Sequence, residues 1–554
     1  MTGVVSPMEG VVYPPADVLQ TYCDDNAFTG QSLAAGFNAA LRDYGSRTAL
    51  SGPEGVMSYA DLDQRATQFA AALLELGLTP LDRVVFQLPN CSELIVALIA
   101  CWKADLIPVC ALPAHREQEI GYLANHAEAR AHIVAGADEK FDAPEFALKM
   151  QKQVPTLSSV IVARGEAPTG AHAMDNLIDG VDISSAKDRL GEIRHDPFQV
   201  AVFQLSGGTT GVPKIIPRFS NEYLYNMLRS AAFTGFTKDD VVFCPTPIIH
   251  NAGMACLALP SLLAGAELVV APTLDPPVFM QIMKEQKPTR FGVAGPMLSR
   301  LGAINFKNLV DLSHVHSVVS MNAARQVDEI LGVKGVHIYG MAEGLICFTT
   351  VEDENQPRVE TVGRPISDLD DVVIVRPGTE EPVAEGEIGE LTVRGPYTIH
   401  GYYNAPERNR EAFTSEGRYR SGDLMSYRNY GRQRYYVFEG RLKDVVDRGG
   451  EKINCEEVER ALRAHPDIAD AAVVGFSDAD FGERACAALI ANPGATAPSV
   501  KQLGAFLEKY GLAKFKWPER VEIFNEFPAT KVGKLDKRAL RAEVENRQEK
   551  GLAS

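Results

Sequence analysis

The chain has 554 residues, which is too long for one ordinary domain and long enough to bury a large core. Hydrophobic residues make up 45% and charged residues 23% of the sequence, as in typical soluble globular proteins. The formal net charge of -17 argues against a nucleic-acid-binding protein, because contacts with phosphate groups require an excess of Lys and Arg.

The N-terminal residues and the cysteines indicate in which cellular compartment the protein is expected. The opening sequence, MTGVVSPMEGVVYPP, lacks the basic stretch and apolar run of a signal peptide. The longest apolar stretch, Leu94–Trp102, is too short to span a bilayer. The nine cysteines are odd in number and form no CxxC pair, which favours reduced, buried thiols. We therefore expect a cytoplasmic protein without a membrane partner.

Short β-rich runs alternate with helical stretches over the first 440 residues. Arg83–Leu88 is typical of a buried strand, and an apolar helix over Glu93–Ile99 follows it. The helical segment Pro277–Glu285 lies between later runs of the same kind. Those runs are Val241–Phe243, Glu267–Val270 and Ser317–Val319. Such alternation predicts βαβ units and mostly parallel sheets, with ligands near the carboxyl ends of strands.

The pattern changes from about residue 371 onward. Residues 371–403 contain β-rich runs separated by Gly and Pro, which predicts an antiparallel subdomain. The strand-like run Arg434–Glu439 ends at Gly440 and a charged segment follows. A compact α+β pattern comes next, with a helix over Glu456–Ala464 and a strand over Ala471–Gly475. We place a domain boundary at 440–444, giving domains over residues 1–440 and 441–554.

A loop rich in glycine and hydroxyl residues follows the strand-like run Phe203–Leu205. Glycines let a backbone approach an anion and point successive N–H groups toward it, while hydroxyl groups and a lysine add donors. A flexible turn is the alternative, but so many residues of this kind directly after an apolar strand make it improbable. The spacing is neither that of a P-loop nor a Rossmann GxGxxG. The predicted phosphate-binding residues are Ser206, Gly207, Gly208, Thr209, Thr210, Gly211 and Lys214.

This loop resembles the phosphate loop of the adenylate-forming superfamily, which includes acyl-CoA synthetases, adenylation domains of nonribosomal peptide synthetases and firefly luciferase. The resemblance covers nearly the whole chain. It implies an α/β fold in which the N-terminal domain has two doubly wound mixed sheets and a small β-rich subdomain, followed by a mobile α+β C-terminal domain. It also implies that ATP and Mg²⁺ activate a carboxylic acid as an acyl-adenylate, which then passes to a thiol.

A second motif, Tyr339-Gly340-Met341-Ala342-Glu343-Gly344, resembles the nucleotide motif of the superfamily. By this resemblance Glu343 would hold the Mg²⁺ that bridges the ATP phosphates. Tyr339, Gly340 and Met341 would contact the nucleotide and frame the acyl pocket. Taken alone, a glutamate in a glycine-rich stretch is more often a solvated carboxylate.

The remaining motifs occur in the order that the superfamily shows. Asp423, in Tyr419-Arg420-Ser421-Gly422-Asp423, would accept both ribose hydroxyls, for which a carboxylate has suitable acceptors. In the hinge motif, Arg441 would touch ribose or phosphate and Lys443 would be the pivot. Lys534 matches the C-terminal catalytic lysine, which would neutralise charge between the carboxylate and the α-phosphate. Taken alone, each of these residues could be an ordinary turn or surface residue. Five motifs in the order of the superfamily make that alternative improbable.

Within the superfamily the chain is most similar to stand-alone aryl-acid ligases for 2,3-dihydroxybenzoate or salicylate. The similarity includes Gln204–Gly208 and Ile216-Pro217-Arg218. The His250-Asn251 pair matches a pair whose Asn bonds the 2-hydroxyl of the acid, although a histidine at a helix start is the alternative for His250.

Other positions of the implied acid pocket depart from those ligases. Ala252 stands where those ligases have a Tyr, and Cys256 stands where they have a Ser that bonds a 3-hydroxyl. By the same resemblance, Ile346 would line the ring of the acid. Met321 and Asn322 stand where those relatives have two glycines. These departures favour a salicylate-like or another aryl acid over strict 2,3-dihydroxybenzoate.

By the same resemblance we expect the acceptor to be coenzyme A or the phosphopantetheine of a separate aryl carrier protein, and we expect no carrier domain in the few residues after Lys534. The departures in the pocket favour CoA. The alternative is an aryl-acid-AMP ligase that loads a carrier protein in siderophore or related biosynthesis. A non-catalytic binding protein on an adenylation fold and a luciferase-type oxygenase are rivals of other classes. A homodimer is an open alternative to a monomer.

Overall fold

The computed structural model describes residues 3–139, 141–206, 213–272, 276–293, 295–321, 323–448, 451–478, 481–510, 512, 514–530 and 534–551. The chain divides into two compact units, which are described separately. The first comprises Met1–Asp371 with Val393–Tyr419, and the second comprises Val372–Thr392 with Arg420–Ser554. The predicted boundary at 440–444 falls inside the second unit, so it stays a prediction.

The first of two sheets in the described residues of unit one is almost entirely parallel. Only its last strand, which forms a hairpin with the strand before it, runs antiparallel to its neighbour. Its inner strands are buried along almost their whole length, as expected of a parallel sheet covered on both faces. The strands, in spatial order, are β7 (His172–Ala173), β6 (Ser159–Val162), β5 (Ala131–Val134), β3 (Arg83–Gln87), β4 (Ile107–Cys110), β8 (Val200–Leu205) and β9 (Ile215–Phe219).

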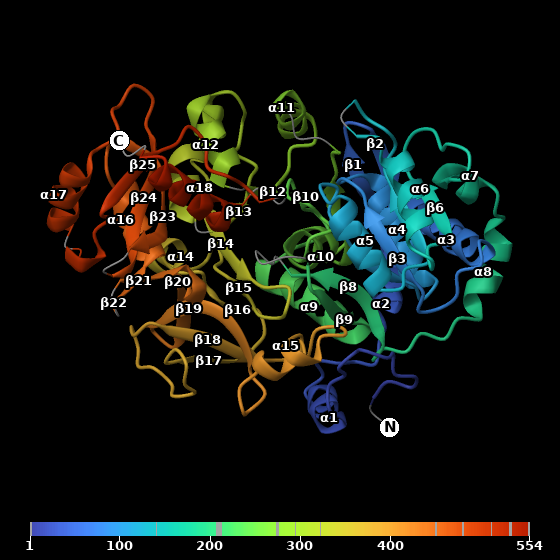
Figure 1. Cartoon of the computed structure of the whole chain (residues 1–554). Coiled ribbons are helices and arrows are strands. Elements are labelled where there is room, and N and C mark those ends of the chain that lie inside the picture. The colour runs from blue at the N-terminus through green and yellow to red at the C-terminus, as the bar shows by residue number, and fades with distance from the viewer. Residues whose placement is uncertain are drawn as a thin grey trace. The chain divides into compact units, whose positions relative to one another are not determined.

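The second sheet is mixed, with a parallel centre and antiparallel strands at both edges. Figure 1 shows its strands β10 and β13 in green and yellow, and β3 and β6 of the first sheet in blue and cyan. Its strands, in spatial order, are β16 (Arg364–Pro365), β15 (Ile346–Phe348), β14 (Gly335–Gly340), β13 (Ser317–Ser320), β12 (Arg290–Val293), β10 (Val241–Phe243), β11 (Glu267–Val269), β1 (Thr48–Gly52) and β2 (Gly55–Ser58).

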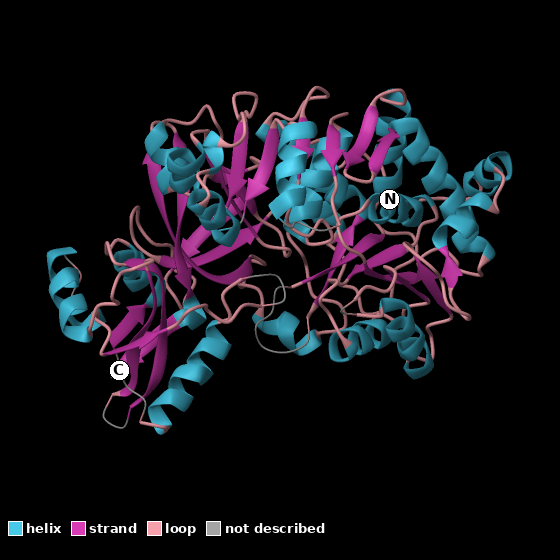
Figure 2. Cartoon of the chain, turned by 90° about the horizontal axis from the view of Figure 1, so that it is seen from above, coloured by secondary structure: helices cyan, strands magenta, loops and turns pink. Residues whose placement is uncertain are grey.

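Helices lie on both sides of the strands of this unit (Figure 2). The predicted apolar helix is α4, and it is buried from Leu94 to Lys103 within the main hydrophobic core. The helical segments are α1 (Ala16–Asp24), α2 (Leu33–Asp43), α3 (Tyr59–Glu75), α4 (Ser92–Lys103), α5 (Glu117–His126), α6 (Ala143–Gln153), α7 (Met174–Asp179), α8 (Ile183–Gly191), α9 (Ser220–Thr234), η1 (Gly253–Ala258), α10 (Leu259–Leu263), α11 (Pro276–Glu285), α12 (Gly295–Ala303), η2 (Phe306–Asn308), α13 (Ala324–Leu331), α14 (Asn355–Glu360) and α15 (Pro406–Glu411).

In its described residues, the second unit contains two further sheets and several helical segments. One sheet has the order β17 (Asp371–Val375), β18 (Gly389–Arg394), β19 (Tyr419–Tyr430) and β20 (Gln433–Arg441). The other has the order β22 (Glu451–Asn454), β21 (Val445–Arg448), β24 (Gly482–Ala491) and β23 (Ile468–Asp478), and β25 (Arg520–Ile523) also pairs with β24. The helical segments are η3 (Leu442–Asp444), α16 (Cys455–Arg463), α17 (Val500–Tyr510), η4 (Lys514–Lys516) and α18 (Lys537–Glu549).

The observed elements confirm the predicted α/β class with its β-rich region and its α+β C-terminal part. The predicted helix Pro277–Glu285 is α11, and the predicted strand Ala471–Gly475 forms the middle of β23. Among the residues that the structure describes, no helix combines the length and the apolar character needed to cross a membrane.

Candidate active site

The hairpin of β8 and β9 carries the predicted phosphate loop. The Ser206 N–H donates to the Lys214 carbonyl at 3.0 Å, and the Lys214 N–H donates to Ser206 Oγ at 3.1 Å. These two bonds close the base of the loop, so Ser206 has a structural contact in addition to its predicted contact with phosphate. The predicted phosphate-binding residues Gly207, Gly208, Thr209, Thr210 and Gly211 lie outside the described residues.

Tyr402 joins the predicted phosphate-loop lysine to the predicted magnesium carboxylate. Lys214 Nζ lies 5.0 Å from the centroid of the Tyr402 ring, and the Tyr402 hydroxyl donates to Glu343 Oε1 at 2.8 Å. The hydroxyl groups of Tyr402 and Tyr419 are 2.8 Å apart. Burial, followed by the negative charge of Glu343, raises the pKa of Tyr402 and keeps this phenol protonated as a donor. No sequence motif had pointed to Tyr402.

Glu343 lies in the turn between β14 and β15. The turn is held by the Met341 N–H, which donates to the Leu345 carbonyl at 3.2 Å, and by the Ile399 N–H, which donates to the Glu343 carbonyl at 2.8 Å. Tyr339 is buried and Gly340 is exposed at the end of β14. The Tyr402 hydroxyl bonds one of the two Glu343 oxygens. A single carboxylate fits Mg²⁺, which usually keeps several waters and takes oxygens from phosphates.

Asn251 is the predicted acid-binding residue with the most defined surroundings. Its side chain is buried, and its Oδ1 accepts from the Tyr223 hydroxyl at 2.8 Å and from Arg218 Nη1 at 3.2 Å. His250 Nδ1 accepts the N–H of Ala252 at 3.3 Å, which is the helix-start role that the sequence left as the alternative. The structure therefore brings Asn251 into a polar network and places His250 at the start of the helical segment.

The remaining predicted pocket residues lie on η1 and β15. Ala252 is half-buried at the start of the π-helix η1, and Cys256 is fully buried within it. π-helical turns are frequent at functional sites. Burial raises the pKa of the Cys256 thiol, while the charge of Arg218 acts in the opposite direction, so the thiol is neutral. Ile346 on β15 belongs to the same hydrophobic core as Cys256. Met321 is exposed, and Asn322 lies outside the described residues.

The second unit brings four predicted residues together at the end of the β19–β20 pair. Asp423 and Arg441 are opposite each other in the strand register, and Asp423 Oδ1 lies 3.4 Å from Arg441 Nε. Desolvation lowers the pKa of Lys534, Arg441 lowers it further, and Asp423 opposes both. Desolvation and then Arg441 likewise lower the pKa of Lys443, although both lysines are exposed to solvent. Arg441 thus places a positive charge near both lysines, and a multiply charged anion bound there would offset this repulsion.

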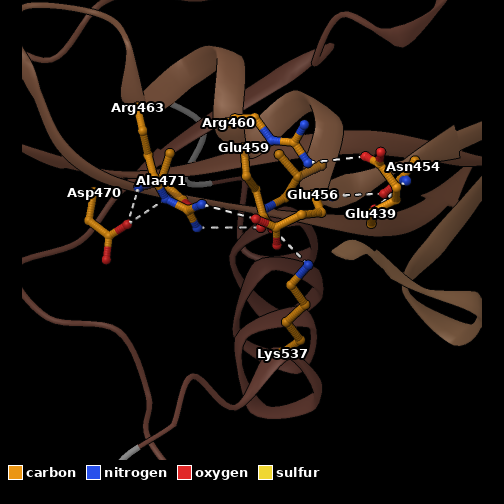
Figure 3. A network of polar contacts seen from close by, with 10 residues as sticks. Glu439, Asn454, Glu456, Glu459, Arg460, Arg463, Asp470, Ala471 and Lys537 are labelled. Carbon is orange, nitrogen blue, oxygen red and sulfur yellow. Dashed lines mark hydrogen bonds and ion pairs between the residues drawn. The ribbon is translucent and has the colours of Figure 1, made fainter. Parts of the chain in front are cut away.

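A polar network joins the end of β20 to the helix that follows the predicted hinge (Figure 3). Asn454 Nδ2 donates to the Glu439 carbonyl at 2.6 Å, and Arg460 Nη2 lies 3.2 Å from Glu439 Oε2. Between them Gly440 has φ +126°, and a Cβ there would lie 2.9 Å from Asn454 Oδ1. Only glycine suits this backbone and this close approach. Sequence reasoning assigned no role to Glu439 or Arg460.

Comparisons with known proteins agree with these motifs. Residues 37–403 match the AMP-binding enzyme family, and residues 457–534 match the AMP-binding enzyme C-terminal domain. The chain is 39% identical over 534 residues to the pyochelin synthase PchD of Pseudomonas aeruginosa (strain UCBPP-PA14), covering 95% of each chain. It is 36% identical over 542 residues to a salicylyl-CoA synthase / salicylate adenylyltransferase of Streptomyces sp, covering 96% of this chain and 97% of the relative.

A solved structure gives the same result. The apo structure of Mycobacterium smegmatis MbtA superposes with a TM-score of 0.73 at 31% identity, covering 96% of this chain and 99% of the other. The family matches, the sequence relatives and the solved structure all indicate the same family, and the relatives and the solved structure cover at least 95% of this chain. The chain therefore belongs to the family of AMP-binding enzymes and is an acid-activating ligase of the adenylate-forming superfamily.

Proposed function

We propose that this enzyme uses ATP to convert an aromatic carboxylic acid into an acyl-adenylate and then transfers the acyl group to a thiol. The observation that carries the proposal is that Tyr402 contacts both Lys214, through its ring, and Glu343, through its hydroxyl. A cation at the base of a glycine-rich loop and a nearby carboxylate able to hold Mg²⁺ are two features suited to binding ATP phosphates.

In the first step the substrate carboxylate attacks the α-phosphorus of ATP, and the bond to pyrophosphate breaks as the acyl-phosphate bond forms. Lys214 would bind the phosphates, and Lys534 would balance the charge that develops between the carboxylate and the α-phosphate. Asp423 would accept the ribose hydroxyls, with Arg441 beside it. Glu343 would hold Mg²⁺, which when bound neutralises the pyrophosphate.

In the second step a thiol attacks the acyl carbonyl, loses its proton and expels AMP. We propose that residues 441–554 rotate about Lys443 between the steps, because the positively charged surroundings suited to phosphate chemistry are not those that a thiol needs. The C-terminal family match beginning at residue 457 supports a boundary before that residue.

The acid is proposed to be salicylate or a closely related ortho-substituted aryl acid. Asn251 supplies a fixed amide, and Cys256 offers only a neutral thiol, which bonds a 3-hydroxyl weakly. The name of the Streptomyces relative, a salicylyl-CoA synthase / salicylate adenylyltransferase, supports the same class of acid.

The acceptor is proposed to be CoA, with the phosphopantetheine of an aryl carrier protein as the alternative. The name of the Streptomyces relative includes a CoA synthase activity as well as an adenylyltransferase activity. We place the enzyme in the cytoplasm, since all nine cysteines lie in the described part of the chain, none is in a disulfide and eight are buried. A homodimer remains a prediction, which measurement of the molecular mass in solution would test.

The test is acid-dependent release of pyrophosphate from ATP with Mg²⁺ across benzoate, salicylate, 2,3-dihydroxybenzoate and anthranilate, each with and without CoA. We expect salicylate to be preferred, and salicylyl-CoA to form only when CoA is present. Pyrophosphate release without any CoA thioester would indicate that the acceptor is the phosphopantetheine of a carrier protein and not CoA. The absence of release with every aromatic acid would overturn the proposal.

A further inference from the structure

Arg218, on β9, is fully buried and has an acceptor for each of its guanidinium N–H groups. Nε and Nη2 donate to the two oxygens of Glu222 at 2.8 and 2.9 Å. Nη1 donates to Asn251 Oδ1 at 3.2 Å and to the Ala342 carbonyl at 3.0 Å, and Nη2 also donates to the Tyr397 carbonyl at 3.4 Å. A guanidinium has five N–H donors in a rigid plane, and all five are used.

Burying the Arg218 charge costs desolvation free energy, so stabilisation of the fold alone does not explain this residue well. Burial alone acts on both partners toward neutrality and raises the pKa of Glu222, but the bidentate contact and the permanent charge of Arg218 keep the pair ionised. A buried ion pair is often no more stable than apolar residues of the same volume. The contacts that Arg218 makes beyond Glu222 are therefore the informative ones.

One of these contacts fixes the orientation of the Asn251 amide. Arg218 can only donate, so the oxygen of the amide has to face it. The Tyr223 hydroxyl donates to the same oxygen at 2.8 Å, and its own acceptor position receives Gln204 Nε2 at 3.2 Å. With two donors holding Oδ1, the NH₂ group of Asn251 is turned to the opposite side and presents donors only.

The other contacts connect this amide to the loop of the predicted magnesium carboxylate. Ala342, whose carbonyl accepts from Arg218, directly precedes Glu343. Tyr397, whose carbonyl also accepts, lies two residues before Ile399, and the Ile399 N–H donates to the Glu343 carbonyl at 2.8 Å. A single side chain thus contacts the acid-binding amide and both backbone segments that hold Glu343.

We propose that Arg218 is a positioning residue that holds the NH₂ group of Asn251 toward the acid and ties it to the Glu343 loop. This inference rests on the proposed function and adds the basis of acid selectivity to it. Acids with an acceptor in the ortho position are favoured. Salicylate is such an acid, because its hydroxyl proton bonds its own carboxylate and leaves the oxygen to accept. Benzoate has no ortho acceptor, and the amine of anthranilate is a poor one.

The test measures pyrophosphate release by the full chain with salicylate and with benzoate, separating kcat from KM. In Tyr223→Phe the Asn251 amide loses one of two donors, which corresponds to a fall of about 3- to 10-fold in the salicylate-to-benzoate ratio of kcat/KM. The fall is expected in KM for salicylate, with KM for ATP unchanged. Tyr225→Phe is the matched control, because Tyr225 lies on the same helix and its hydroxyl contacts Ser367 at 2.7 Å instead.

Two further variants separate positioning from stability. In the Asn251→Ala background, Tyr223→Phe is expected to leave the acid ratio unchanged, because the two residues act through one bond. Arg218→Lys keeps the charge but has too few donors, and we expect it to lower kcat with both acids as well as the ratio. An unchanged ratio in Tyr223→Phe would overturn this inference alone. No pyrophosphate release by the wild type with any aromatic acid would overturn the proposed function and this inference together.

Discussion

Two ion-pair networks in this chain are built in opposite ways. Around Arg218 a single cation contacts four residues, and both it and Glu222 are buried. In the second unit the pairs of α16 are spread over several side chains, and Arg460 is 50% exposed where it meets Glu439. Buried contacts of this kind hold one geometry, whereas exposed pairs exchange readily with water. The first network suits a binding site whose geometry has to stay fixed. The second suits a segment whose contacts have to break when the C-terminal part moves.

The second network also has an inner, buried part (Figure 3). Glu459 is only 1% exposed, and its Oε1 accepts from Lys537 Nζ at 2.7 Å and from the Val473 N–H at 2.7 Å. These contacts join α16 to α18 and β23, all beyond the predicted hinge. The part-buried hydrogen bond of Asn454 to the Glu439 carbonyl and the exposed ion pair of Arg460 with Glu439, by contrast, cross the predicted hinge. The buried ion pair of Glu459 with Lys537 therefore lies within the C-terminal part, whereas the exposed ion pair of Arg460 with Glu439 lies across the segment about which that part is proposed to move.

The largest effect is expected from Lys534→Ala, which removes the exposed cation proposed to act in adenylation. Acid-dependent pyrophosphate release should fall by about 100-fold or more, as for loss of a charge that acts in the transition state. Thioester formation from preformed acyl-AMP should remain largely intact. Lys514→Ala, an exposed lysine of the same unit, is the control. An equal loss of both half-reactions would contradict the assigned role.

Glu222→Gln breaks the buried network at its anionic member. The charge of Arg218 then lacks its counter-ion, so the free energy of unfolding should fall by about 3 kcal/mol or more. Chemical denaturation followed by tryptophan fluorescence measures this change. A loss of less than about 1 kcal/mol would mean that this pair behaves like a surface pair, and the contrast between the two networks would disappear.

Asp370 tests the pH dependence of the first unit. Burial raises its pKa to about 8, and the Tyr397 hydroxyl donates to its Oδ2. Because the folded pKa is above the unfolded one, the stabilisation is fully present below about pH 4. It is lost as pH rises through about 8, by at most about 1.4 kcal/mol per pH unit. Asp370→Asn should therefore flatten the decline in the unfolding free energy between pH 6 and 8. Parallel curves for the two proteins would show that Asp370 ionises normally.

The smallest effect on stability is expected from Glu439→Gln, which weakens the exposed contact across the hinge. The free energy of unfolding should change by less than about 1 kcal/mol. If the contact restrains rotation, thioester formation from acyl-AMP should accelerate by about 2- to 5-fold, corresponding to the energy of such a pair. Stopped-flow measurement of AMP release checks this. A slower second half-reaction would mean that the contact supports the rotation rather than restraining it.

The sequence predicted the regular elements well because their signal is local. The apolar run after β3 indicated a buried helix, and α4 is one. The contacts between side chains could not be predicted in this way. Tyr402 is 59 positions from Glu343, and nothing near either residue indicates their hydrogen bond. Ile216-Pro217-Arg218 carried a family likeness, but burial of the arginine depends on acceptors as distant as Tyr397, 179 positions away.

The double occupation of Asn251 Oδ1 has a consequence for enzyme engineering. Replacing Asn251 alone by an apolar residue would leave the Tyr223 hydroxyl and one Arg218 N–H without their acceptor, at a cost of about 1–3 kcal/mol for each. Libraries that randomise only this position would therefore consist largely of variants with reduced stability. To change the acid preference, Asn251 and Tyr223 should be substituted together. Arg218 should be kept, and the new side chains should be chosen to satisfy its N–H groups.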